Sequence, residues 1–373
     1  MDFSRTPAPL AGSSHVCTNP SVTASMGTAD AVEHTSVPCS GARAKRRCKY
    51  TTIAVDPSVP SLPMTQFGDF APLCHTVPSY PWCNLFYRQL EDNDRSVLVS
   101  ISADPASAPV GVNPYCGTLR LGHDHSSGNV ANIVVCAVSI VFVGWLLFLA
   151  RRRKAAVGRI EFCQFLTLYF LTLPFQLITT GSFLEQGSTP LTAITAVHAG
   201  LVAATFWALL GNALVSTQLV EDGTLASLIP FNFLILAFFA ATTYISLDVG
   251  FTLTHVFGPS NPPQNLHSVP VFVLTSIWPG AAAIIYFLLM IYVVLGILNE
   301  FRPIWYYVLA MILFVLSQLD YFLLNKVICE GTSAKIDGSF VATILETAAV
   351  GILYMGWRSI TEGSWDENVY YPW

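Results

Sequence analysis

The stretch that most constrains the fold runs from Asn129 to Lys154. About twenty uncharged, mostly apolar residues lead into the basic cluster Arg151, Arg152, Arg153 and Lys154. At about 1.5 Å per residue, a helix of that length crosses the hydrocarbon core of a bilayer. Basic residues that flank a span stay on the cytoplasmic side of the membrane. The stretch therefore predicts a membrane-spanning helix and anchors the orientation of everything that follows.

Further apolar segments follow this span, separated by short connections that contain Gly, Pro or charged residues. They lie near residues 160–180, 191–218, 228–250, 270–298, 305–325 and 339–358. Only 11% of all residues are charged, whereas a soluble domain carries about a quarter, so lipid must cover much of the surface. We predict an all-α integral membrane protein whose seven transmembrane helices occupy residues 129–358.

The chain before the first span falls into two parts. Residues 1–63 are rich in Ser, Thr, Ala and Pro and nearly lack aromatic residues, which predicts a disordered leader. The composition changes abruptly there, and an alternative is that Met64 is the true start of the protein. Residues 64–128 contain many Gly and Pro between short apolar runs. They predict a small, loop-rich element outside the bilayer.

The predicted orientation gathers four cysteines in one compartment. With the basic cluster in the cytoplasm, residues 64–128 and the connection before the last helix lie outside the cytoplasm, and the acidic and aromatic tail 359–373 is cytoplasmic. Cys74, Cys83, Cys116 and Cys329 then share an oxidising environment. We predict two disulfides, with three pairings open. A bridge to Cys329 would tie the N-terminal element to the helices.

Four ionisable side chains fall inside predicted spans: His198, Asp248, Asp320 and Glu346. Such groups are costly in lipid, so each is a candidate functional residue. Asp320 and Glu346 are predicted to lie at similar depth, where a carboxylate pair would relay protons or bind a cation. The simpler interpretation is that each hydrogen-bonds to polar neighbours such as Gln318.

No motif in the sequence indicates catalysis. We find no phosphate-binding glycine loop, no nucleophile elbow and no metal-ligand spacing. We interpret His123, Asp124 and His125 as a solvated turn. A net charge of −5 and only short basic runs argue against nucleic-acid binding. We therefore expect a lipid-embedded protein with no enzymatic activity, metal, cofactor or nucleic-acid partner.

Several short motifs, in this order along the chain, resemble those of the fungal chitin synthase export chaperones. The motif residues are Phe67, Asp69 and Phe70 ahead of Cys74; Gly158, Arg159 and Glu161; Glu221, Asp222 and Gly223; and Glu330, Gly331, Asp337 and Gly338 around the start of the last helix. Tyr354–Trp357 and Trp365–Glu367 also fit the closing pattern of that family.

The resemblance implies a multi-pass protein of the endoplasmic reticulum membrane, with a lumenal N-terminus and a cytoplasmic C-terminus. Later secretory compartments and the plasma membrane are further expected locations. The protein would be needed for a chitin synthase, itself an integral membrane protein, to leave the reticulum, and would thereby support cell-wall chitin synthesis. Small residues such as Gly200, Ala203, Ala204 and Gly280–Ala283 would let client helices approach, unless they pack inside the bundle. The alternative function is a seven-helix receptor or small-solute transporter with a polar site around Asp320 and Glu346.

Overall fold

The part of the chain that the structure describes begins at residue 66. The structure is a computed structural model that describes residues 66–362, except 78, 95–97, 99–119, 124–125, 155, 181–183, 219–220, 255 and 334. The described residues belong to one compact unit. Four parts of the sequence-based predictions lie outside the described residues: the leader, the alternative start at Met64, Cys116, and residues 363–373 of the tail.

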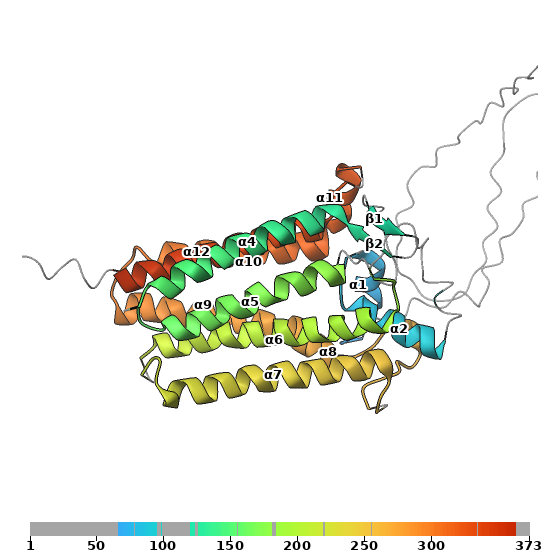
Figure 1. The fold of residues 1–373 in the computed structure, drawn as a ribbon, viewed down its shortest axis with the longest axis horizontal. Coiled ribbons are helices and arrows are strands. Elements are labelled where there is room, and N and C mark those ends of the chain that lie inside the picture. Colours follow the sequence, from blue (N-terminus) through green and yellow to red (C-terminus); the bar gives the residue numbers. More distant parts are fainter. Residues whose placement is uncertain are drawn as a thin grey trace, which may run out of the picture. The chain divides into compact units, whose positions relative to one another are not determined.

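Seven helices of the described chain are long and apolar enough to cross a membrane, which confirms the predicted class (Figure 1). The first four are α4 (Val130–Arg152), α5 (Arg159–Thr180), α6 (Thr189–Ser216) and α7 (Leu225–Phe251). The last is α12 (Gly338–Glu362). The apolar stretches that predicted these spans match the observed helices because each is bounded by a turn-forming or charged residue.

The fifth and sixth spans are composite helices that contain turns of π-helix. The fifth consists of α8 (Val269–Phe272), η2 (Val273–Ile277), α9 (Trp278–Ile291) and η3 (Tyr292–Ile297). The sixth consists of α10 (Ile304–Leu319), η4 (Asp320–Leu324) and α11 (Asn325–Gly331). The sixth span therefore runs six residues past its predicted end at 325, and Cys329 lies in a helix rather than in a loop. Such π turns insert an extra residue and often occur at functional sites.

Two short helices, α1 (Ala71–Thr76) and α2 (Cys83–Asn93), pack on one end of the helix bundle. We call residues 66–94 the cap and that end the cap end; the opposite end, which carries Arg151–Lys154, is the basic end. The side chains of Phe70, Leu85 and Phe86 are fully buried. They pack with α6 and α7 residues in one apolar cluster. The cap is thus part of the hydrophobic core.

A hairpin that the sequence did not predict precedes α4 at the cap end (Figure 1). Its antiparallel strands are β1 (Arg120–His123) and β2 (Ser126–Asn129), with Arg120 opposite Asn129. Strands this short, with Ser and Gly and without alternating apolar residues, carry little of the signal by which strands are recognised. The β2 strand ends at Asn129, whose side chain accepts a hydrogen bond from Asn132 N at 3.3 Å and caps α4.

Candidate functional site

The motifs around residues 158–161 and 221–224 bind each other at the basic end. The fully buried carboxylate of Glu161 accepts hydrogen bonds from Gly223 N at 3.1 Å and from Ser227 Oγ at 3.2 Å. In return, Asp222 Oδ2 accepts from Gly158 N at 2.9 Å. These reciprocal bonds, which we call the basic-end clamp, join the α4–α5 and α6–α7 connections. The two motifs are therefore halves of one structural unit.

The predicted topology anchor lies beside this clamp. Arg151, Arg152 and Lys154 are exposed, and Arg153 is half-buried. Arg159 donates to the backbone oxygen of Arg151 at 3.4 Å. The last span is tied to the same region because Trp357 Nε1 donates to Val157 O at 3.2 Å. The cluster therefore presents its charge to solvent or lipid head groups while the clamp holds its backbone.

A second polar clamp at the cap end is centred on Asp337. Its buried carboxylate accepts from Asn129 Nδ2 at 3.1 Å, from Ser339 Oγ at 2.7 Å, from Phe340 N at 3.2 Å and from Ser79 Oγ. The bond from Phe340 N makes Asp337 a cap of α12. We call this network the cap-end clamp. It joins the cap, the start of the first span and the start of the last span.

The first motif of the chain attaches the cap to the connection between α7 and α8. Asp69 Oδ1 lies 2.8 Å from His267 Nδ1, and Ser268 N donates to Gly68 O at 3.0 Å. The φ angle of Gly68 is +98°, and a Cβ there would lie 2.9 Å from a methyl carbon of Val269. Only glycine fits this close approach without strain. Phe67 is exposed, but its ring meets Phe272 at 5.2 Å edge to face.

The residues of the last motif have different surroundings. Gly338 lies where a Cβ would come within 2.6 Å of Asp320 O, so α12 begins in direct contact with the sixth span. Glu330 is exposed and forms a loose ion pair with Lys326 at 3.9 Å, and a Cβ on Gly331 would meet nothing within 4 Å. Asp337 and Gly338 therefore carry the packing of this motif.

Two cysteines of the cap are bonded to each other. Cys74 and Cys83 form a disulfide, with their Cα atoms 5.7 Å apart. Cys329 is disulfide-bonded as well, whereas Cys116 lies outside the described residues. Cys136 and Cys163, inside α4 and α5, are free thiols. The first bridge fixes the Tyr80-Pro81-Trp82 turn between its two cysteines.

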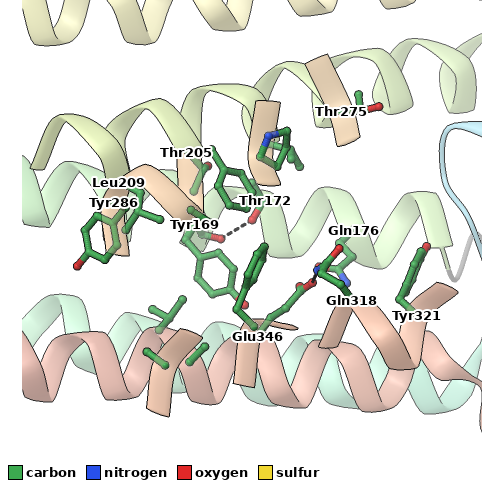
Figure 2. A pocket seen from close by; sticks show the side chains of 18 of the residues that line it. Tyr169, Thr172, Gln176, Thr205, Leu209, Thr275, Tyr286, Gln318, Tyr321 and Glu346 are labelled. Atoms are coloured by element: carbon green, nitrogen blue, oxygen red, sulfur yellow. Dashed lines mark hydrogen bonds between the residues drawn. The ribbon is translucent and has the colours of Figure 1, made fainter. Parts of the chain in front are cut away.

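A cavity of about 220 Å³ lies inside the bundle, and the Tyr80-Pro81-Trp82 turn forms part of its wall. Residues of α5, α6, α9, α10 and α12 form its walls, and two of the three described π turns, η2 and η4, contribute Thr275 and Tyr321. Tyr80 and Trp82 of the cap line it too. Burial raises the pKa of the Tyr80 phenol well above its ordinary value, so the hydroxyl stays protonated. Figure 2 shows the lining from close by.

The four predicted intramembrane groups do not form one site. Glu346 lines the cavity and accepts a hydrogen bond from Gln318 Nε2 at 3.2 Å (Figure 2). His198 also lines it, and its Nδ1 lies 2.9 Å from Thr179 Oγ1. Asp320 starts the π turn η4 and is not among the residues that line the cavity. Among the described residues, no hydrogen bond joins Asp320 to Glu346.

Asp248 has a structural environment at the cap end of α7. Its carboxylate accepts from Thr254 N at 2.5 Å, from Thr254 Oγ1 at 2.8 Å and from Phe257 N at 3.1 Å. The side chain thus organises the chain that leaves α7, where backbone N–H groups would otherwise lack acceptors. It does not line the cavity.

Several buried amides that the sequence did not single out hold the cap and the first two spans in place. Gln89 donates to Val249 O at 2.9 Å and accepts from Ser260 Oγ at 3.2 Å, and it is 2% exposed. Asn84 donates to Thr179 O at 3.1 Å. Asn132 of α4 donates to Thr180 Oγ1 of α5. The polarity of an amide does not reveal its partner, and each of these partners lies far away along the chain.

Comparison with known proteins supplies the family. A family model described as "Chitin synthase export chaperone" matches residues 66–371. A chitin synthase export chaperone of Chaetomium globosum is 28% identical over 304 residues, covering 79% of this chain and 83% of that protein. The proteins of the same name from Fusarium oxysporum f. sp. lycopersici and Neurospora crassa are 28% and 27% identical, covering 80% of this chain and 83% and 78% of theirs. No solved structure matches. The match runs from the cap through all seven spans, and the chain therefore belongs to the chitin synthase export chaperone family.

Proposed function

We propose that this protein is a membrane-embedded chaperone required for a chitin synthase to leave the endoplasmic reticulum, and that it thereby supports cell-wall chitin synthesis. The observation that carries the proposal is the family match over residues 66–371, which takes in the cap and the whole helix bundle. The relatives that align with about 80% of this chain are named for that activity. A chaperone acts by binding its client, so the role needs no catalytic residue.

In this proposal the cap end faces the lumen and the C-terminus is cytoplasmic. The disulfide between Cys74 and Cys83 suits an oxidising lumen. The exposed Arg151, Arg152 and Lys154 suit the cytoplasmic side of the membrane. An odd number of spans then puts the two ends of the chain on opposite sides. We also keep the divisions at residues 63, 128 and 358 as proposed domain boundaries.

The client would bind through a face of the bundle that is open to lipid. Of the small residues singled out in the sequence, Gly200 packs against α7, and Ala203 and Ala204 are fully buried. Gly280 differs, because a Cβ there would meet no atom of the described chain within 4 Å. Glycine on an open helix face lets the backbone of another helix approach closely. We propose the Gly280 face of α9 as a client contact.

The alternative function, a receptor or a small-solute transporter, is not favoured. It relied on a site shared by Asp320 and Glu346, and only Glu346 lines the cavity. The bundle as a whole matches a family named for export of another protein.

The test is the location of a tagged chitin synthase in a strain that lacks this gene. We expect the synthase to stay in the endoplasmic reticulum and to reach the cell surface when the wild-type gene is restored. Normal arrival in the deletion strain would contradict the proposal. In a strain that carries Gly280→Leu, the synthase should stay in the endoplasmic reticulum although the level of the chaperone is unchanged. In a strain that carries Gly331→Leu, a change at another glycine with free space, the synthase should reach the cell surface normally.

A further inference from the structure

The chaperone role makes no use of the cavity inside the bundle, yet this cavity has a specific chemistry. Its wall holds one carboxylate, that of Glu346, and none of its described lining residues is Lys or Arg. Gln318 Nε2 is the one hydrogen-bond donor that the described residues give to this carboxylate. A carboxylate inside a membrane bundle is costly unless a positive charge or several donors accompany it. The protein supplies a single neutral donor, so the carboxylate has capacity for a cationic partner.

Aromatic rings make up much of the remaining wall. They come from the cap, from α5, α6, α9 and α10, and from the π turn η4, and include Trp82, Tyr169, Phe206, Tyr286, Phe314 and Tyr321. The face of an aromatic ring carries negative electrostatic potential and attracts ammonium groups, most strongly where water is excluded. An aromatic wall with one carboxylate is therefore complementary to an organic cation. It is poorly suited to an anion, because no Lys or Arg lies among its described lining residues.

The size of the cavity limits the ligand. A cavity of about 150 Å³ lined by apolar residues holds one benzene molecule, and this cavity measures about 220 Å³. It therefore takes a molecule somewhat larger than benzene, or a lipid head group without its acyl chains, and excludes a folded peptide. Figure 2 shows the Glu346 side chain directed at Gln318 within this space.

The geometry points to a binding site for a small organic cation, with its ammonium centre at Glu346 and its alkyl groups against the aromatic wall. The ammonium would ion-pair with the carboxylate oxygen atoms while Gln318 holds their orientation. The free cation and the head group of a lipid that carries the same ammonium share this chemistry. The inference goes beyond export of the client, since it concerns a ligand of the chaperone itself.

The test uses choline as the probe and 3,3-dimethylbutan-1-ol as its neutral twin, in which carbon replaces the charged nitrogen. Binding to the purified full-length protein is followed by tryptophan fluorescence, because Trp82 lines the cavity. We expect saturable binding of choline and at least tenfold weaker binding of the alcohol. Equal responses to both compounds, or no response to choline up to 50 mM, would overturn the inference. This comparison needs no mutation.

Variants then locate the site. Glu346→Gln keeps the shape of the side chain and removes its charge, and it should weaken choline binding at least tenfold. Glu185→Gln, at an exposed glutamate in the connection between α5 and α6, should bind like wild type. Unchanged binding by a folded Glu346→Gln variant would refute the placement. If Glu346→Gln does not fold, Phe314→Leu at the aromatic wall replaces it, with a loss of binding expected.

Two lipid environments separate the sources of the ligand. In bilayer discs of phosphatidylglycerol, free choline should bind. In discs of phosphatidylcholine, weaker apparent binding would identify the lipid head group as a competing occupant, and equal binding would identify the free cation. Because choline binding is measured without a synthase present, its failure would leave the export function untouched. A failure of export would likewise leave the binding result standing.

Discussion

Replacing Asp337 by alanine should loosen the cap end of the whole bundle. The substitution removes the acceptor of four hydrogen bonds, from Ser79, Asn129, Ser339 and Phe340. Loss of a helix cap costs about 1 kcal/mol. Each buried donor left without a partner costs about 1 to 3 kcal/mol, and the hydroxyl of Ser79 and the amide of Asn129 are both buried. Together these terms lower the free energy of unfolding by about 4 kcal/mol.

The assay is thermal denaturation of the purified protein in one detergent, read as the fraction that stays monodisperse. At about 2–4 °C per kcal/mol, Asp337→Ala should lower Tm by about 8–16 °C. Glu330→Ala is the matched control, because that carboxylate is exposed and its ion pair with Lys326 is long, at 3.9 Å. Such surface pairs contribute little, so its Tm should stay within about 2 °C of wild type. An Asp337→Ala protein that melts as late as this control would refute the role of the cap-end clamp.

Three further changes test other parts of the structure by the same melting assay. Gly338→Ala should lower Tm by several degrees, because its Cβ would press on backbone atoms of the sixth span. Gly331→Ala is the control: its Cβ meets free space, so Tm should stay unchanged or rise. Equal effects of the two variants would contradict the close contact at Gly338. Glu161→Gln keeps a carbonyl acceptor for the basic-end clamp and should change the free energy of unfolding by less than about 1 kcal/mol, whereas Glu161→Ala should lower it by about 2 kcal/mol. A larger loss in Glu161→Gln than in Glu161→Ala would mean that the charge itself is required. Cys74→Ser opens a short disulfide loop and should lower the free energy of unfolding by about 2–3 kcal/mol. The Cys74→Ser/Cys83→Ser double variant should lose no more than the single variant. Additive losses would argue against the bridge between Cys74 and Cys83.

The membrane spans were accessible from the sequence because hydropathy depends on composition alone. The sixth span shows the limit of that signal. Asn325, Lys326 and Glu330 make its last turns polar, so the prediction ended at 325, whereas the helix continues to Gly331. Its backbone hydrogen bonds persist beyond the apolar stretch because the cap end of the bundle extends past it. At the cap end, the length of the helix therefore exceeds the length of its apolar stretch.

The site was predicted less well than the spans. Glu346 was identified as a candidate from its charge, and the simpler interpretation is confirmed for it, because its partner is Gln318 rather than Asp320. The π turn that begins at Asp320 has no counterpart in the hydropathy pattern, so the sequence did not predict it. The pairing of Glu161 with Gly223 joins residues far apart in the chain. No single-sequence pattern carries such a contact.

The order in which the ribosome makes the chain gives the cap-end clamp a consequence for biosynthesis. Asn129 and Ser79 are synthesised long before Asp337, which arrives only as the last span emerges. Until then the donors of the first span and of the cap lack this carboxylate as an acceptor, so the cap end of a nascent or truncated chain remains incomplete. Closure of the full network, which includes Ser339 and Phe340, therefore requires that translation has passed the start of the last span. A chain cut short before that point would be distinguished by buried donors at the cap end that have lost their acceptor.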